Sequence, residues 1–323
     1  MNRSVCMSLL AALSVAACGD DVEPLRAGEV AEPPAPSSPG IIEEPPVEEM
    51  PDEPETIEPT GPQTYVSVAR TLKFARIDET GRSWGFDLDA RVSTASDREA
   101  CYQEDFRSPM GDEGVDNQFA RLLPLIEAAG GAALEGLVQS AINEGDLLVM
   151  MEISGVDDWQ NDGDVQVTLY RGTGLPYVGT DGYVEAWQTF DIDPEAPWSR
   201  VEHVALHDGV LEAGPFALTL PIYVFDFVFY ITVGDARLHI EFDERGPHSA
   251  MMGGAIALQN ILDIANNIDG GQQIPGVVEN LGRTFADLDR DDEGHCQALS
   301  VALRANLAGA FFYDDTERPT GAE

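Results

Sequence analysis

Two stretches of this chain alternate apolar and polar residues, a period of two that predicts half-buried β-strands. The alternation covers 165–170 and 236–242. A longer run at 216–233 is nearly all apolar. Its Pro221, its Asp226 and its many aromatic and β-branched residues favour core strands over a membrane helix. Shorter strands are expected at 65–68, 71–74, 86–92, 147–153, 201–206, 210–213 and 299–312.

Helical pairs interrupt these strands at two places, 117–144 and 251–286. Apolar residues recur there at helical spacing, with Asp116 as the expected N-cap of the first pair and 251–268 as one helix of the second. Hairpin signals dominate the middle of the chain, so neighbouring strands are expected to be antiparallel. The prediction is an α+β fold over 64–323: an antiparallel β-sandwich or bent sheet with two helical-pair insertions.

The N-terminus has the pattern of a signal peptide over 1–17, with an apolar stretch too short to span a membrane. It ends in Val15-Ala16-Ala17-Cys18, which resembles a bacterial lipobox. The resemblance implies a diacylglycerol on the Cys18 thiol and cleavage after Ala17. The alternative is a plain secretory signal with a coincidental cysteine. Gly19 follows, where lipoproteins kept on the inner membrane typically carry Asp, so the resemblance favours the outer membrane.

The lipidated cysteine and a tether are expected to occupy 18–63. Eleven of the 21 prolines lie in this stretch, together with many acidic residues and few aromatic ones. Such a composition cannot build a core, so we expect a disordered acidic spacer with polyproline II character. The remaining 64–323 is expected to form a single globular domain.

The formal net charge of −40 limits the choice of partners. A chain this acidic repels phosphate backbones and anionic headgroups, so we expect no nucleic-acid binding and membrane contact through the lipid anchor only. Cations, basic proteins and neutral glycans remain compatible. The plain alternative is that acidity keeps a tethered protein soluble.

Four cysteines are present, and two of them are assigned to the signal peptide and the lipid anchor. Cys101 and Cys296 remain, an even pair in an oxidising compartment, and a disulfide between them is expected. The alternatives are two free thiols or a reactive cysteine, and no Cys/His/Asn signature supports the latter.

The best local signal for a binding site is a run of alternating carboxylates that begins at Asp287. It resembles the start of an EF-hand-type calcium loop. It departs from that loop at Asp292, which stands at the sharp-turn glycine position, and at Ala298, which stands at the bidentate glutamate position. Calcium takes six to eight oxygen ligands, so other segments would have to contribute.

A bond between Cys101 and Cys296 would bring a second acidic loop beside this one. Such crowding is repulsive unless a cation or an arginine, Arg107 or Arg290, lies between the loops. The sequence leaves two interpretations open, a calcium site or two solvated acidic loops. The candidate ligands are Asp287, Asp289, Asp291, Glu293, Asp112 and Asp116. No other cofactor is expected.

No catalytic residue is predicted. The G-x-S-x-G pattern at 81–85 has a turn before it and a strand after it, the wrong context for a nucleophile elbow. His203 and His207 lie on an expected strand, where a spacing of four residues is roughly 13 Å, too far for one ion. The other three histidines are scattered along the chain.

Two segments, Gly114-Val115-Asp116-Asn117-Gln118 and Ala286-Asp287-Leu288-Asp289 with the following Cys296-Gln297-Ala298-Leu299-Ser300, resemble predicted surface lipoproteins of GC-rich predatory bacteria. The resemblance spans most of 64–313. No activity is known for these lipoproteins, so the resemblance supports the localisation and the disulfide and implies no catalysis.

These observations favour a lipid-anchored envelope protein that serves as a binding or adhesion module. Two alternatives stay open at this point: a structural envelope component without a ligand, and a secreted hydrolase that uses paired carboxylates.

Overall fold

The computed structural model describes residues 61–128, 134–224, 227–268 and 273–319. They belong to one compact unit, Glu58–Glu323. The signal peptide expected over 1–17, Cys18 and the tether up to residue 60 lie outside the described residues.

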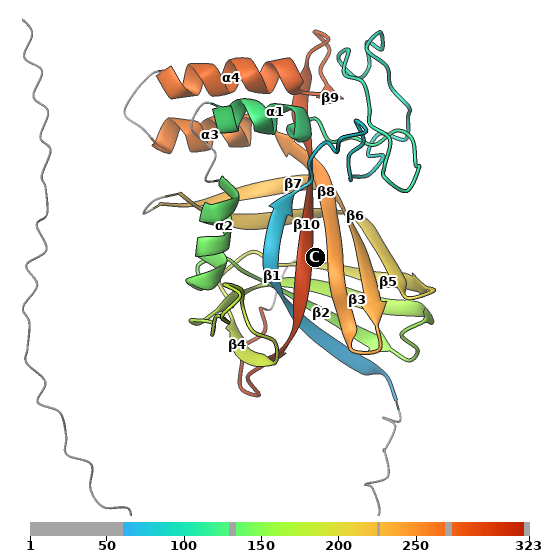
Figure 1. Cartoon of the computed structure of the whole chain (residues 1–323), viewed down its shortest axis with the longest axis vertical. Helices are drawn as coiled ribbons and strands as arrows, with labels where there is room; N and C mark the ends of the chain where they lie inside the picture. The colour runs from blue at the N-terminus through green and yellow to red at the C-terminus, as the bar shows by residue number, and fades with distance from the viewer. Residues whose placement is uncertain (1–60, 129–133, 225–226, 269–272, 320–323) are drawn as a thin grey trace, which may run out of the picture. The chain divides into compact units, whose positions relative to one another are not determined.

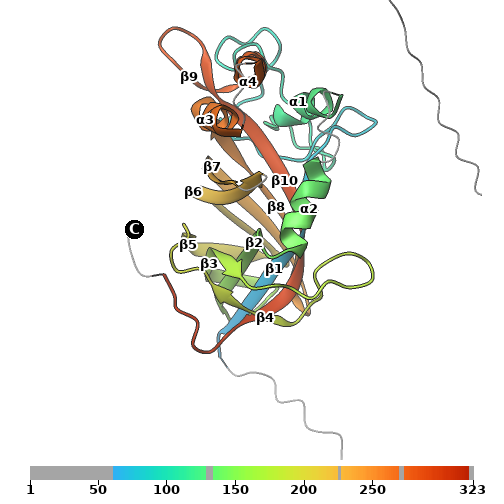
Figure 2. The ribbon, with the colours of Figure 1, turned by 90° about the vertical axis from the view of Figure 1, so that its left-hand side faces the viewer.

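Eight strands form a closed antiparallel barrel (Figures 1 and 2). In order around the barrel they are β1 (Gln63–Phe74), β2 (Leu148–Val156), β3 (Asn161–Thr173), β5 (Ser199–His207), β6 (Val210–Val224), β7 (Phe227–Asp243), β8 (Gly246–Ala257) and β10 (Cys296–Phe312). The barrel closes because β1 pairs with β2 on one side and with β10 on the other. The closing register runs from Ser67 opposite Gly309 to Phe74 opposite Leu303.

This barrel corrects the expected α+β sandwich or bent sheet, because the described chain is mostly β with few helices. An open sheet leaves backbone groups unpaired along its edges, and here the first and last strands satisfy each other. β3 removes the other potential edge because it pairs with β5 as well as with β2, with Val167 opposite Val201.

Apolar side chains that alternate along the strands fill the barrel. Met151, Leu169, Leu206 and Leu238 belong to one continuous buried cluster. The space left among the inward-facing residues of β1, β2, β3, β7, β8 and β10 is about 20 Å³, room for about one water molecule. This part of the described interior is therefore a packed core.

A second buried cluster lies outside the barrel wall, under α2 (Leu134–Asn143) and β4 (Gln188–Ile192). Ile142, Tyr170 and Phe190 belong to it. β4 pairs in parallel with the end of β10 and antiparallel with the end of β3.

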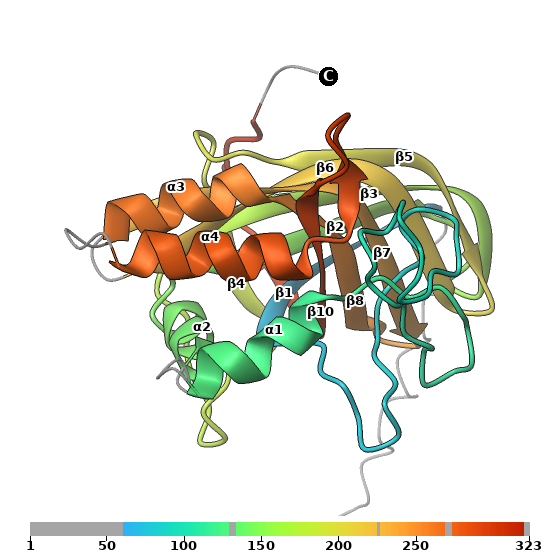
Figure 3. The same ribbon diagram turned by 90° about the horizontal axis from the view of Figure 1, so that it is seen from above.

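The other helices form a cap at one end of the barrel (Figure 3). They are α1 (Phe119–Ile126), α3 (Leu258–Ile268) and α4 (Gln273–Phe285), and the short strand β9 (Leu288–Arg290) pairs beside them with the start of β10. Leu122, Leu258 and Leu299 share one buried cluster under this cap. Among the described residues, no helix combines the length and the apolarity that crossing a membrane requires.

Most of the expected strands and all four helical regions are present, with three local corrections. The strand expected at 86–92 is a loop in which Phe86 alone forms a bridge, to Asp116. Residues 251–257 belong to β8, so the helix of that pair begins at Leu258. Asp116 is not a helix cap, because α1 begins at Phe119 after the N-cap residue Gln118.

Candidate functional site

Three carboxylates from two segments converge near the start of α1. Among the described residues, Asp87, Asp89 and Asp116 form a group whose potential ligand oxygens all lie within 4.8 Å of one another. The bridge to Phe86 explains the convergence, because the Asp116 N–H donates to the Phe86 carbonyl at 2.9 Å. The Leu88 N–H in turn donates to Asp116 Oδ2 at 2.7 Å. Asp116 is only 3% exposed.

Burial is the main cause that raises the pKa values of Asp89, Asp105, Asp116 and Asp287, and nearby carboxylates add to it. Burial, together with the charges of Asp287, Asp105 and Asp89, raises the pKa of Asp116 to about 9. Burial is also the main cause that raises the pKa of Asp105 to about 6 and that of Asp287 to about 7. We call Asp87, Asp89, Asp105, Asp116 and Asp287 the acidic cluster. Its carboxylates oppose one another's ionisation, so protons or a cation must neutralise part of the charge.

Asp287 has a structural role that its burial makes plain. The Ser300 N–H donates to Asp287 Oδ1 at 2.9 Å, and the Ser300 hydroxyl donates to Oδ2 at 2.6 Å. The same hydroxyl accepts the Gln118 N–H at 2.7 Å. Asp287 therefore fixes the start of α1 to β10 and has little free capacity for a ligand.

The other predicted ligands lie outside the three-carboxylate group. Asp291 accepts the His295 N–H at 2.8 Å and the Gln297 amide at 2.6 Å, which closes the turn between β9 and β10. Asp112 accepts the Ser108 hydroxyl at 2.7 Å within its own turn. Asp289 and Glu293 are likewise not members of the group. The structure thus brings together only Asp116 and Asp287 of the six candidates.

The predicted disulfide is present and joins the two acidic loops. Cys101 and Cys296 are bonded, with their Cα atoms 6.0 Å apart. Arg290 lies 3.3 Å from Glu99 and Arg107 pairs with Glu113, so these arginines are engaged by other carboxylates. Among the described charges, those that shift the Asp116 pKa most are all acidic.

Asp87, Asp89 and Asp105 were not among the predicted ligands, although Asp105 belongs to the second acidic loop that the disulfide was expected to bring close. Asp87 and Asp89 have the same alternating spacing that drew attention to Asp287 and Asp289. The signal was present, but the expected strand at 86–92 would have placed both on an ordinary solvated face. The bridge from Phe86 to Asp116 is a tertiary contact that no local sequence pattern predicts.

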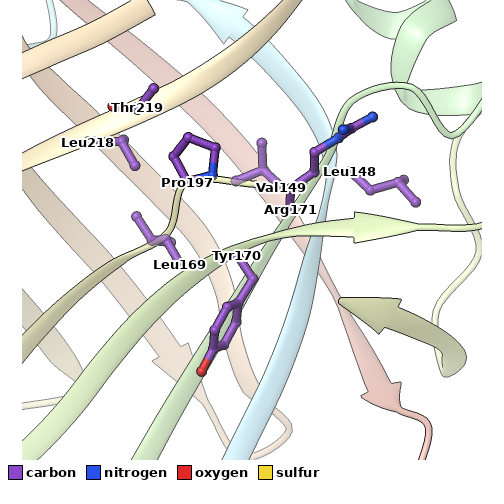
Figure 4. A pocket seen from close by; sticks show the side chains of 8 residues that line it. All are labelled: Leu148, Val149, Leu169, Tyr170, Arg171, Pro197, Leu218 and Thr219. Atoms are coloured by element: carbon purple, nitrogen blue, oxygen red, sulfur yellow. The ribbon is translucent and has the colours of Figure 1, made fainter. Parts of the chain in front are cut away.

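The described pockets are small. Figure 4 shows one in the barrel wall, where Leu169, Pro197 and Leu218 approach one another, with a volume of about 10 Å³. A second, between α3 and α4, has about 160 Å³. Pockets for small-molecule ligands usually measure about 300–1,000 Å³, so these two do not suit such a ligand.

Exposed aromatic rings gather where β4 runs beside the end of β10. Tyr177, Trp187 and Phe311 are 80%, 58% and 51% exposed, and we call them the aromatic patch. The rings of Trp187 and Phe311 are 5.9 Å apart. Phe311 lies opposite Thr189 in the parallel pairing, so residues 187 and 311 share the outer face while Phe190 is buried in the core.

Local contacts hold the aromatic patch in place. Trp187 has a φ of 64°, which a bulky residue rarely adopts, and its N–H donates to the Gly309 carbonyl at 2.6 Å. The indole lies so close over Gly309 that a Cβ there would come within 2.5 Å of the ring. Gln188 accepts the Tyr177 N–H at 2.6 Å and donates to its carbonyl at 3.0 Å. The rings are therefore presented in a preformed arrangement.

Comparison with family models, with curated proteins and with solved structures gave no match to this chain.

Calcium is predicted to raise the Tm of this protein through the acidic cluster. At calcium a hundredfold above its Kd, linkage gives about 2.7 kcal/mol, or about 5 °C or more for a domain of this size. Asp116→Asn should abolish the response and raise the Tm in chelator near pH 7, since the amide oxygen can still accept the Leu88 N–H and folding no longer requires the uptake of a proton. Differential scanning calorimetry measures both. Asp112→Asn, whose carboxylate serves the Ser108 turn, is the matched control and should respond like the parent. Equal responses in all three proteins would contradict the assignment.

Stability in chelator is expected to fall as pH rises. The folded pKa of Asp116 is about 9, above the ordinary value of about 4 for an unfolded Asp. A group of this kind stabilises the fold fully below its unfolded pKa, and that contribution is lost as pH rises through the folded pKa. The free energy of unfolding should therefore decline between about pH 4 and pH 9, as measured by denaturant titration. In Asp116→Asn the decline should be smaller, and a decline of unchanged size would show that other groups cause it.

Proposed function

We propose that this chain is a lipid-anchored protein of the bacterial cell envelope, at the outer membrane, that binds a protein partner through the aromatic patch on its barrel. The lipobox-like Val15-Ala16-Ala17-Cys18 supports the anchor, and the acidic, proline-rich stretch after it supports display on a long spacer. The filled barrel interior directs binding to the outer surface.

The observation that carries this proposal is the rigid exposure of Trp187. Exposed aromatic rings on a preformed surface are typical of the residues that supply most of the energy of protein–protein binding. The strained backbone at Trp187 has a cost of order 1–3 kcal/mol, and such outliers cluster at functional sites.

The charge around the aromatic patch defines the chemistry of the partner. Glu185 lies beside Tyr177, since its N–H donates to the Tyr177 carbonyl at 3.0 Å, whereas Asp181 of the same loop is paired with Arg70 at 2.8 Å. A basic segment would place arginine or lysine side chains against both the Glu185 carboxylate and the indole face of Trp187. A second copy of this chain, with its own charge of −40, would be repelled.

Two other roles make different predictions. A structural envelope component needs no patch-dependent binding. A secreted hydrolase would need a substrate cleft beside paired carboxylates, and the described pockets are too small for one.

Changing Cys18 to Ser is expected to release the protein from membranes. The thiol is the only acceptor for the diacylglycerol, and stable anchoring needs that modification. Cell fractionation with an alkyne-labelled fatty acid should place the parent protein in the outer-membrane fraction with label and the variant in the soluble fraction without it. Cys6→Ser, in the expected signal peptide, is the control and should keep the label. Label retained by the Cys18 variant would show that the anchor is assigned wrongly.

Binding of a basic peptide is expected to depend on Trp187. The probe is a fluorescent peptide of alternating arginine and alanine, and its binding is measured by fluorescence anisotropy. Attraction by net charge alone would not depend on the aromatic patch, so variants of the patch separate the two causes of binding. Trp187→Ala should weaken binding at least tenfold, the effect expected of a central aromatic residue. Tyr230→Ala removes another exposed ring, on β7, and should leave the affinity unchanged.

Three further measurements separate the alternatives. A peptide with glutamine in place of arginine should bind weakly, and 0.5 M salt should weaken the arginine peptide. Binding of a neutral oligosaccharide in its place would overturn the choice of partner. Equal affinity in the Trp187 and Tyr230 variants would overturn the choice of surface and leave the structural role as the better account.

A further inference from the structure

Two of the five histidines meet at one carboxylate on the outer wall of the barrel. The register places Glu212 on β6 opposite His239 on β7, and Glu241 on β7 opposite Ser249 on β8. His239 and Glu241 are two residues apart, so they share the outward face. The pairing of β7 with β8 shifts at this point: Glu241 pairs with Ser249, and the next residue, Phe242, pairs with Pro247. His248 is therefore an extra residue of β8 without a partner in the register. The extra residue brings its imidazole to the same face.

Both imidazoles approach the Glu241 carboxylate without bonding to it. His239 Nε2 lies 3.9 Å from Glu241 Oε1, and His248 Nε2 lies 3.7 Å from Glu241 Oε2. Both distances exceed those of a hydrogen bond, so neither imidazole is bonded to the carboxylate. The Ser249 hydroxyl donates to Glu241 Oε2 at 2.9 Å and holds that carboxylate in position.

Glu212 sets the orientation of His239. His239 Nδ1 lies 3.3 Å from Glu212 Oε1, and a carboxylate can only accept there, so Nδ1 carries the proton. In the neutral ring, Nε2 then presents its lone pair toward Glu241. This carboxylate–imidazole pairing is the arrangement that proteins use to hold a metal-binding histidine in the correct tautomer.

We propose that His239, His248 and Glu241 bind a divalent transition metal ion, with zinc as the best fit. Ligands bonded to zinc at 2.0–2.1 Å in a tetrahedron lie roughly 3.3 Å apart. The two observed separations, 3.9 Å to Oε1 and 3.7 Å to Oε2 of Glu241, start from different oxygens, and the three ligand groups do not form a set within 4.8 Å of one another, so side chains must turn before one ion can contact all three. The side chains of Glu241 and His248 are 48% and 47% exposed, so they are free to turn and close the shell. Two imidazoles and one carboxylate suit zinc, and they do not suit calcium, which prefers an all-oxygen shell.

A simpler account is that these groups form cross-strand ion pairs. It requires protonated imidazoles and predicts no affinity for zinc. The metal site predicts that Glu212, which touches no ion, nevertheless raises the affinity, because it fixes the tautomer of His239. Three ligands with a fourth position open to solvent would also let a partner side chain or water complete the site.

The test is isothermal titration of the metal-free full chain, without an affinity tag, with zinc chloride and with cobalt chloride. We expect one zinc per chain, and the visible absorption bands of tetrahedral cobalt. His239→Gln and His248→Gln should each weaken zinc at least tenfold, and Glu212→Gln about tenfold. His203→Gln is the matched control, because His203 also lies beside a carboxylate, Asp164 at 2.7 Å, but has no second imidazole. It should leave zinc binding unchanged.

Circular dichroism of each variant checks that these surface substitutions leave the fold intact. Failure to bind zinc up to 1 mM would overturn the proposal in favour of ion pairs. Equal loss of zinc affinity in the His203 and His239 variants would also overturn the proposal. So would zinc binding that Asp116→Asn abolishes and His239→Gln retains, since the ion would then occupy the acidic cluster.

Discussion

The pairing of β1 with β10 is the interaction on which the remaining structure depends. It joins residues more than 200 positions apart, Ser67 with Gly309, and converts a meander of strands into a barrel without edges. Closure encloses the inward-facing residues that the structure describes, and the space among those of β1, β2, β3, β7, β8 and β10 is about 20 Å³. β10 also positions both ends of the domain. Ser300 near its start donates hydrogen bonds to Asp287, and Gly309 near its end packs against the ring of Trp187.

The acidic cluster is tolerable because covalent and hydrogen bonds hold its parts together. The disulfide spans 195 residues, and the chain-entropy model gives a stabilisation of about 5 kcal/mol for such a closure. Asp287 and Ser300 fix the start of α1 to β10, while the bridge from Phe86 to Asp116 fixes the loop with Asp87 and Asp89. These restraints bring like charges together at a cost that a proton or a cation reduces. The raised pKa of Asp116 expresses that cost directly.

How far the sequence predicts this structure depends on the range of the contacts involved. The alternation at 236–242 predicted the inward and outward faces of β7 correctly, because each residue reports its own burial. Barrel closure has no such local signal. The prediction of a helix from residue 251 was wrong, because Met251-Met252-Gly253-Gly254 belongs to β8. A Cβ at Gly254 would come within 2.5 Å of Val233, so the strand backbones must approach closely there. The number of cysteines was enough to predict the disulfide. The proximity of Asp87 to Asp116 depends on a tertiary contact, which the sequence does not predict.

A filled barrel leaves binding to the surface, and three different surfaces of this domain have chemistry suited to positive charge. The acidic cluster offers oxygen ligands beside the cap, Glu241 and its histidines offer a mixed shell on the barrel wall, and the aromatic patch sets rings beside Glu185. They arise on separate elements and share no residue, so their common preference comes from the composition of the chain and not from a common origin in the fold. A net charge of −40 raises the local concentration of every cation near this protein. What distinguishes the surfaces is the geometry of their donors. We propose that this geometry selects hard oxygen-seeking ions at the first surface, imidazole-seeking ions at the second and extended basic side chains at the third.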